Sequence, residues 1–175
     1  MKTLSKFFLV VLTLLPLLSH AQFGEGSMFL GPHIGLSAYE SSPTFGANFE
    51  FAVNKPGELG DGLLGVSARV DYTSFDWGSG YSWSLLSIGA YCNYHFKVGA
   101  DGKFDPFLGL GLGFHNWSHN YDGPEGGDTF ADNWNSGVYF AANAGARYFL
   151  SKALALRAQV GFGVTFFVFG VDFGI

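Results

Sequence analysis

The stretch 115–119 holds the residues of this chain that could support hydrolytic chemistry. It reads His-Asn-Trp-Ser-His, so the Ser118 hydroxyl lies close in sequence to two imidazoles. A serine nucleophile needs an oriented base beside an activated hydroxyl. The strand alternation described below points His115 into the interior of a barrel rather than toward a lipid substrate. We therefore predict no catalytic residue and expect that the protein is not an enzyme.

Carboxylates and amides gather among glycines in segment 116–136, where they could bind a hard cation such as Ca²⁺. The spacing of Asp122, Asp128 and Asp132 does not fit the register of an EF-hand loop. Two interpretations stay open, a solvated acidic loop and a contact site for a cation or a partner. The residues of that contact site would be Tyr121, Asp122, Asp128, Asp132 and Trp134. We expect no resident metal and no cofactor.

Six charged residues share the polar side of alternating segments. They are Glu50, Arg69, Asp71, Arg147, Arg157 and Asp172. Buried charges are costly unless they are paired, so three acids and three arginines predict a neutral network. A tight turn at 150–153 would bring Arg147 near Arg157, and Asp172 on the adjacent strand is the nearest carboxylate. Either the network plugs the interior, or it lines a narrow polar pathway beside Gly109, Gly111 and Gly113. The lone histidines His33 and His95 are predicted to be hydrogen-bonded interior residues rather than metal ligands.

The composition limits the class of protein. The chain has 175 residues, of which 48% are hydrophobic, 18% aromatic and only 13% charged, with 26 Gly and a net charge of −5. No basic stripe exists to neutralise phosphates, so we expect no nucleic-acid partner. The aromatic content argues against disorder. The single Cys92 excludes an intrachain disulfide framework and a Cys-based zinc cluster.

Residues 1–21 are predicted to be a cleaved secretory signal peptide. Lys2 and Lys6 precede an apolar run at 7–18, and Ser19-His20-Ala21 supplies small residues before the cleavage site. A transmembrane anchor is the alternative, but the run is shorter than the roughly 20 residues that cross a bilayer. We then expect a short lead at 22–27 and one domain at 28–175.

The remaining chain alternates between apolar and polar residues, which is the pattern of half-buried strands. Eight such runs occur, at 30–37, 45–53, 64–72, 86–96, 108–115, 138–148, 154–162 and 167–175. The polar faces carry Gly, Ser, Asn, Arg and Asp but no Lys, which suits the tight interior of a small barrel better than a surface in water. The predicted fold class is therefore all-β, an eight-stranded antiparallel up-and-down transmembrane β-barrel. A soluble exported sandwich or lipocalin-like barrel is the alternative.

The connectors predict an orientation. With the N-terminus on the periplasmic side, the connectors 39–44, 73–82, 116–136 and the turn near Gly163 face the exterior. Connectors 54–61, 97–103 and 150–153 face the periplasm, and they hold all four lysines of the mature chain, Lys55, Lys97, Lys103 and Lys152. All four Trp residues lie at or beyond the exterior strand ends, where an aromatic girdle is expected. Tyr94, Phe96, Phe104 and Tyr148 are candidates for a periplasmic girdle.

The last strand ends in Gly170-Val171-Asp172-Phe173-Gly174-Ile175. This is similar to the C-terminal signal by which outer-membrane barrels are handed to their assembly machinery, with Gly170 and Phe173 in place and Ile175 where Phe is usual. Together with the run 106–113, it makes the chain resemble the small outer-membrane β-barrel superfamily (porin-like, outer-membrane protein X or A transmembrane type) over 28–175.

The resemblance implies an outer-membrane location, with outer-membrane lipids including lipopolysaccharide and the barrel-assembly machinery as partners, and a monomeric state. We expect an envelope-structural or surface-interaction role with a lumen filled by side chains. A narrow porin-like channel is the alternative. An outer-leaflet lipid-modifying enzyme is less favoured, because the His-x-Ser spacing of such deacylases is absent.

Overall fold

The computed structural model describes residues 23–78, 81–98, 102–121 and 135–175, and for residues 77, 78, 81, 120 and 121 it describes the backbone alone. Within these ranges no helix is long and apolar enough to cross a membrane. The strands in these ranges are β1 (Met28–Ser37), β2 (Pro43–Ala52), β3 (Glu58–Asp61), β4 (Leu63–Gly78), β5 (Tyr81–His95), β6 (Phe104–Tyr121), β7 (Gly137–Ser151), β8 (Leu154–Phe162) and β9 (Thr165–Gly174).

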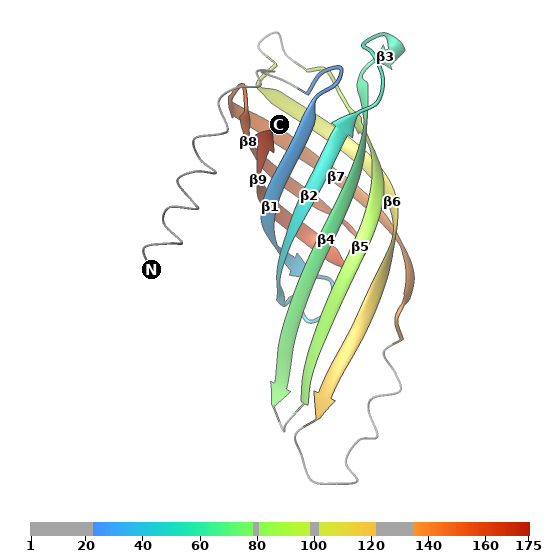
Figure 1. Ribbon diagram of the computed structural model, residues 1–175, viewed down its shortest axis with the longest axis vertical. Coiled ribbons are helices and arrows are strands. Elements are labelled where there is room, and N and C mark those ends of the chain that lie inside the picture. Colours follow the sequence, from blue (N-terminus) through green and yellow to red (C-terminus); the bar gives the residue numbers. More distant parts are fainter. Residues whose placement is uncertain (1–22, 79–80, 99–101, 122–134) are drawn as a thin grey trace.

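All of these strands except β3 form one closed barrel. Each strand pairs antiparallel with the next, and β9 pairs with β1, so the order is β1-β2-β4-β5-β6-β7-β8-β9 (Figure 1). The short β3 lies in the connector between β2 and β4, beside an isolated bridge from Gly57 to Gly60. The predicted eight-stranded antiparallel up-and-down barrel is confirmed.

The barrel has two unlike ends. The end that holds Met28 and Gly174 also carries the connectors β2–β4, β5–β6 and β7–β8, and we call it the terminal end. The opposite, distal end carries the connectors β1–β2, β4–β5, β6–β7 and β8–β9. In Figure 1 the C-terminus and β3 lie at one end, while β4, β5 and β6 extend far beyond the other strands at the opposite end.

The barrel is apolar outside and polar inside. Successive side chains of a strand point to opposite faces, so each alternating run divides cleanly between the two. Leu110 is 71% exposed on the outer face, and Phe140 and Phe162 are each 74% exposed. We call the outward apolar side chains of the barrel strands the apolar belt. Its members include Leu30, Ile34, Phe45, Val70, Leu86, Ile88, Leu108, Leu110, Leu112, Phe140, Val160, Phe162 and Phe169.

The interior is narrow enough that large side chains lie against glycines. A Cβ added at Gly113 would collide with the ring of Tyr139 on the neighbouring strand, and one at Gly89 would approach the Tyr139 hydroxyl to 2.8 Å. Gly111 makes the same room for the ring of Tyr91. These glycines are therefore required by close packing across the lumen, which explains their alternation with Leu along β6.

Three strands rise beyond the rest at the distal end. β4, β5 and β6 contain 16, 15 and 18 residues. The pairing of β2 with β4 ends at Thr73, whereas the pairing of β4 with β5 continues to Gly78. On the other side, the pairing of β6 with β7 ends at His115. Residues 74–78, 81–85 and 116–121 thus form a three-stranded sheet beyond the barrel rim, which we call the projecting sheet.

The projecting sheet corrects the predicted connectors 73–82 and 116–136. Alternation continues in this sheet, but its polarity is reversed: Phe75, Trp83 and Trp117 lie on the inner face, and Ser74, Ser84 and Ser118 form a cross-strand row on the outer face. A strand that is expected to keep an apolar outer face ends where that face becomes polar. The predicted ends of these strands at the rim therefore fall short of the observed ends.

The remaining strand boundaries differ by a few residues. The predicted connector 39–44 loses Pro43 and Thr44 to β2, and connector 150–153 loses its first two residues to β7. Connector 54–61 contains β3, whose four residues are all exposed. Hydrogen bonds extend strands into turns wherever the backbone geometry allows, whatever the side-chain pattern.

The packing of Tyr139 against Gly113 predicts a specific cost of overfilling the lumen. Gly113→Ala should lower the free energy of unfolding by about 1–3 kcal/mol, because its Cβ would overlap the Tyr139 ring. Gly137→Ala on β7 is the matched control, since a Cβ there meets nothing within 4 Å. Denaturant unfolding in detergent would measure both variants. Adding Tyr139→Ala should relieve the defect of Gly113→Ala; equal losses for Gly113→Ala and Gly137→Ala would contradict this packing.

Candidate functional site

The six charged residues singled out from the sequence all lie inside the barrel. Glu50 comes from β2, Arg69 and Asp71 from β4, Arg147 from β7, Arg157 from β8 and Asp172 from β9. Each is buried, with at most 5% of its surface exposed. They do not form one network but two separate clusters, one in the terminal half of the lumen and one nearer its middle.

The larger cluster is built around Arg147, which is completely buried. Arg147 and Arg157 are direct cross-strand partners of β7 and β8. The carboxylate of Asp172 accepts hydrogen bonds from both, from Arg147 Nε at 2.6 Å and from Arg157 Nε at 3.0 Å. Arg147 Nη2 also donates to Glu50. Two guanidinium groups of like charge are thus held side by side by two carboxylates.

Two further residues complete this cluster, and the strand pattern predicts neither of them as a member. Asp105 on β6 lies 3.7 Å from Arg147 Nη1. His95 at the end of β5 contacts Glu50 Oε1 through Nε2 at 3.1 Å and Asp105 Oδ1 through Nδ1 at 2.9 Å. We call these six residues the lumen network; its members are Glu50, His95, Asp105, Arg147, Arg157 and Asp172.

The two hydrogen bonds of the His95 ring indicate its protonation state. A carboxylate can only accept hydrogen bonds, so each ring nitrogen that faces one must carry a proton. His95 faces a carboxylate on both sides and is therefore an imidazolium. Its charge brings the lumen network to three cations against three anions. A charge buried without a partner in such a site would be strongly destabilising.

The smaller cluster contains one carboxylate, one guanidinium and one imidazole. Asp71 accepts from Arg69 Nε at 2.9 Å and from His33 Nε2 at 2.6 Å. The other ring nitrogen of His33 has no hydrogen-bond partner among the described residues. Arg69 also lies over the ring of Tyr91, 4.9 Å from its centroid. His33 and His95 are thus hydrogen-bonded interior residues, as the alternation of their strands predicts.

The lead before β1 enters the barrel. Phe23 is only 7% exposed, and its ring stacks on His95 with 3.9 Å between centroids. Phe23 and Phe29 both place their rings 5.3 Å from the Arg147 guanidinium, and Phe107 lies at 5.8 Å. Aromatic rings thus cover the lumen network at the terminal end. An isolated Phe in a short polar lead carries no pattern from which this position could have been predicted.

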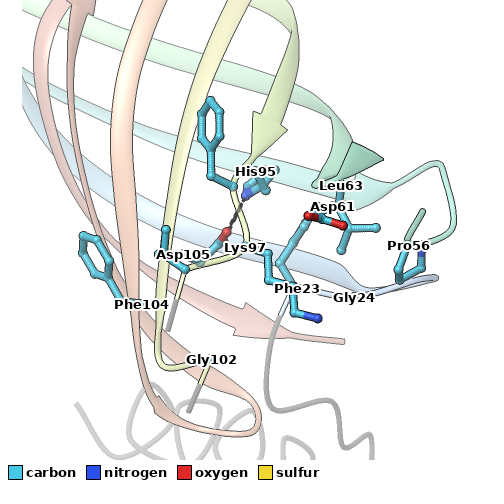
Figure 2. A pocket seen from close by; sticks show the side chains of 12 residues that line it. Phe23, Gly24, Pro56, Asp61, Leu63, His95, Lys97, Gly102, Phe104 and Asp105 are labelled. Carbon is cyan, nitrogen blue, oxygen red and sulfur yellow. Dashed lines mark hydrogen bonds and ion pairs between the residues drawn. The ribbon is translucent and has the colours of Figure 1, made fainter. Parts of the chain in front are cut away.

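Two cavities bear on whether the lumen is open. A cavity of about 10 Å³ lies between the two clusters, which is roughly the space for one water molecule. A larger pocket of about 210 Å³ opens at the terminal end, beside the β5–β6 connector (Figure 2). Its buried wall includes the contact between His95 and Asp105, drawn as a dashed line in Figure 2.

The distal end holds a cluster of rings that corrects the predicted exterior girdle. Trp83 is 5% exposed and lies on the inner face of the projecting sheet, as does Trp117. The rings of Tyr39, Phe75 and Trp83 meet that of Trp117 at interplanar angles of 83°, 85° and 84°. Burial raises the pKa of Tyr39 above its ordinary value. These two Trp side chains therefore pack inward; the side chains of Trp77 and Trp134 lie outside the described residues.

At the terminal end the candidate girdle residues face outward. Phe96, Phe104 and Tyr148 are 40%, 50% and 49% exposed. The Tyr94 hydroxyl donates to the carbonyl of Leu59 at 2.8 Å, which ties the β2–β4 connector to β5. The four lysines of the predicted periplasmic connectors, Lys55, Lys97, Lys103 and Lys152, are all exposed at this end.

The candidate contact site of the 116–136 segment is not placed. Asp122, Asp128, Asp132 and Trp134 lie outside the described residues, and Tyr121 is described only by its backbone at the end of β6. In the described part of the chain no group of His, Cys, Asp or Glu side chains is arranged to hold a metal ion.

The residues considered for catalysis are separated by the sheet. Ser118 points to the outer face of the projecting sheet and pairs across the strand with Ser84. His115 and His119 lie on the inner face, where His115 Nε2 contacts the carbonyl of Asn135 at 3.3 Å. The hydroxyl and the imidazoles are therefore on opposite sides of the same strand.

The terminal segment completes the barrel seam. Gly170 is buried on the inner face of β9, while Phe173 points outward and Ile175 is 46% exposed. The backbone N–H of Ile175 donates to the carbonyl of Met28 at 3.0 Å. The alternation of this segment thus sets Phe173 and Ile175 on the outer surface, beside the start of β1.

Solved barrels share this architecture. A de novo designed transmembrane β-barrel is 18% identical, with 86% of this chain and 97% of the designed chain covered and a TM-score of 0.53. The N-terminal β-barrel domain of Pseudomonas aeruginosa OprF is 13% identical, with 87% and 99% covered and a TM-score of 0.52. The chain has the fold of the small outer-membrane β-barrels.

The resemblance drawn from the C-terminal strand is confirmed at the level of this fold. A second designed barrel, TMB2.3, gives the same result at 17% identity, 88% and 98% coverage and a TM-score of 0.53. No protein-family model and no curated protein matches the chain.

The charge balance of the lumen network predicts that a second substitution can restore stability lost through the first. His95→Gln removes one of three cations and should lower the free energy of unfolding by about 3 kcal/mol. Adding Asp105→Asn removes one anion and restores equal numbers, so the double variant should be more stable than His95→Gln alone. Denaturant unfolding in detergent, followed by circular dichroism, would measure this. If Asp105→Asn instead adds its own loss to that of His95→Gln, His95 is not the third cation.

Proposed function

We propose that this protein is an integral barrel of the bacterial outer membrane, with a lumen closed to solutes and a surface-interaction role at its distal end. The lumen network carries this proposal. Six charged side chains fill the terminal half of the interior, and rings of Phe23, Phe29 and Phe107 cover them. An interior packed in this way supports the barrel without leaving a path through it.

The apolar belt supports the membrane location. A barrel with Leu, Ile and Phe outside and charged pairs inside has the reverse of the polarity that water favours. In hydrocarbon the same arrangement is stable, because every barrel strand has two neighbours and no polar edge meets lipid. We further propose export through the signal peptide at 1–21, recognition by the barrel-assembly machinery through Gly170, Phe173 and Ile175, and a monomeric state.

The projecting sheet supports the surface-interaction role. Packing around Trp117 gives the sheet its own aromatic core, so it stands beyond the barrel as a defined element. Among the described residues, no strand pairs with the outer edge of β4 after Thr73 or of β6 after His115. Such sheet edges and their polar outer face can bind an extended segment of another molecule. A catalytic role is not proposed, because Ser118 and the two histidines point to opposite faces.

Topology in whole cells tests the location and orientation. In a Cys92→Ser background, Ser118→Cys should react with a membrane-impermeant maleimide on intact cells. Lys152→Cys, which is exposed at the terminal end, should react only after the outer membrane is permeabilised. Cys92 in the otherwise natural chain is exposed among outward side chains of the barrel and should be protected by lipid in both cases. Rapid labelling of Cys92 in intact cells would contradict the membrane location.

Planar-bilayer recordings test the closed lumen against the narrow-channel alternative. The natural protein should give no stepwise currents, because the cavity between the clusters measures only about 10 Å³. Tyr139→Ala should widen the distal half of the lumen and remain silent, since the lumen network lies nearer the terminal end. Stepwise currents from the natural protein would favour the channel.

A further inference from the structure

The pocket at the terminal end joins the inside of the barrel to its outer surface. Its described lining comes from the lead, the β2–β4 connector, the start of β4, the end of β5, the β5–β6 connector and the start of β6 (Figure 2). The inner wall is buried and includes Phe23, Leu63 and the His95–Asp105 pair. The outer rim is exposed. The pocket therefore lies on the rim of the barrel, where lumen, solvent and apolar belt meet.

The rim is apolar on the side that continues into the belt. Phe96 and Phe104 are 40% and 50% exposed and belong to the outward girdle, and Val98 is 40% exposed. Side chains at this height of a membrane barrel lie in the interface between headgroups and acyl chains. An occupant of the pocket therefore reaches it from the lipid as readily as from water.

The charges around the pocket match a zwitterion. Lys97 and Asp61 are exposed charges of opposite sign on its lining, and within the described part of the chain neither forms an ion pair. Asp105 on the inner wall is already balanced by His95. A ligand with one anionic and one cationic group would therefore be complementary, whereas a ligand of net charge would leave one side chain facing a group of like sign.

The volume suits a headgroup rather than a whole lipid. The pocket volume of about 210 Å³ gives room for a small polar group but not for two acyl chains. A phosphate joined to an ammonium through two carbons is of this size, and the acyl chains would extend along Phe96 and Phe104. The pocket thus has a place for each part of an aminophospholipid.

We propose that this pocket binds the phosphoethanolamine headgroup of a phospholipid in the leaflet at the terminal end. Lys97 binds the phosphate, Asp61 accepts hydrogen bonds from the ammonium, and Phe96 and Phe104 contact the first part of the acyl chains. The proposal rests on the membrane location proposed above. It adds a specific lipid site to an otherwise nonspecific belt.

Native mass spectrometry from mild detergent tests the site. The purified full chain is mixed with equal amounts of phosphatidylethanolamine, phosphatidylglycerol and phosphatidylcholine of identical acyl chains. The natural protein should retain phosphatidylethanolamine about fivefold more than either of the others, because only this headgroup combines a phosphate with an ammonium that donates hydrogen bonds. A fivefold preference corresponds to about 1 kcal/mol.

The variants separate the two halves of the headgroup. Asp61→Asn should abolish the preference for phosphatidylethanolamine without reducing retention of phosphatidylglycerol. Lys97→Gln should reduce retention of all three lipids, because all three have the phosphate. Lys152→Gln is the matched control, since Lys152 is exposed at the same end but does not line the pocket.

Equal retention of the three lipids by a natural protein that inserts into bilayers would overturn the site and leave the proposed membrane location intact. Equal effects of Lys97→Gln and Lys152→Gln would also overturn it, because they would indicate general attraction between lysines and lipid. A chain that does not enter bilayers at all would contradict the proposed function itself. Circular dichroism of each variant in detergent confirms that the barrel has folded before lipids are compared.

Discussion

The ion pairs of Arg147 are the interaction on which the rest of this structure depends. Its guanidinium is wholly buried between carboxylates of β2 and β9 and rings from the lead, β1 and β6. A cation in this position is tolerated only if anions surround it closely, and those anions in turn require further cations. Arg147 binds the carboxylates of Asp172 and Glu50, and Asp172 also binds Arg157. Glu50 in turn contacts His95, whose other ring nitrogen contacts Asp105. One buried side chain thereby ties together strands from all around the barrel.

This balance explains how charged groups pack into the terminal half of the lumen and why its two halves differ. In the terminal half, charged groups meet directly and rings seal them from solvent. Nearer the middle, Arg69, Asp71 and His33 form a separate group, and glycines leave room for Tyr91 and Tyr139. The His95–Asp105 contact is the point where the buried network reaches the terminal pocket. The same two residues therefore contribute to the seal and to the inner wall of the proposed lipid site.

The polarity of β4, β5 and β6 reverses along their length, which is the change expected of strands that leave the proposed membrane for water. Within the belt, apolar side chains face outward and polar ones fill the lumen. Beyond the rim, Ser74, Ser84 and Ser118 face outward, and Phe75, Trp83 and Trp117 form the inner face. A sheet in water must bury its apolar side, whereas a barrel in hydrocarbon must expose it. In the proposed membrane location, the level of this reversal would be the edge of the hydrocarbon layer on this side of the barrel.

Alternation by itself determined the eight strands, their antiparallel order and which side chains point inward, because a strand has only two faces. It also brought Arg147 near Arg157, since the two flank a tight turn, and marked His33 and His95 as interior residues. It could not reveal that Asp105 joins the lumen network or that Phe23 covers it, because neither residue lies in one of the eight alternating runs. Nor could it predict the projecting sheet, where the polarity pattern reverses. Only barrel closure, which sets distant strands opposite one another, decides which buried charges meet.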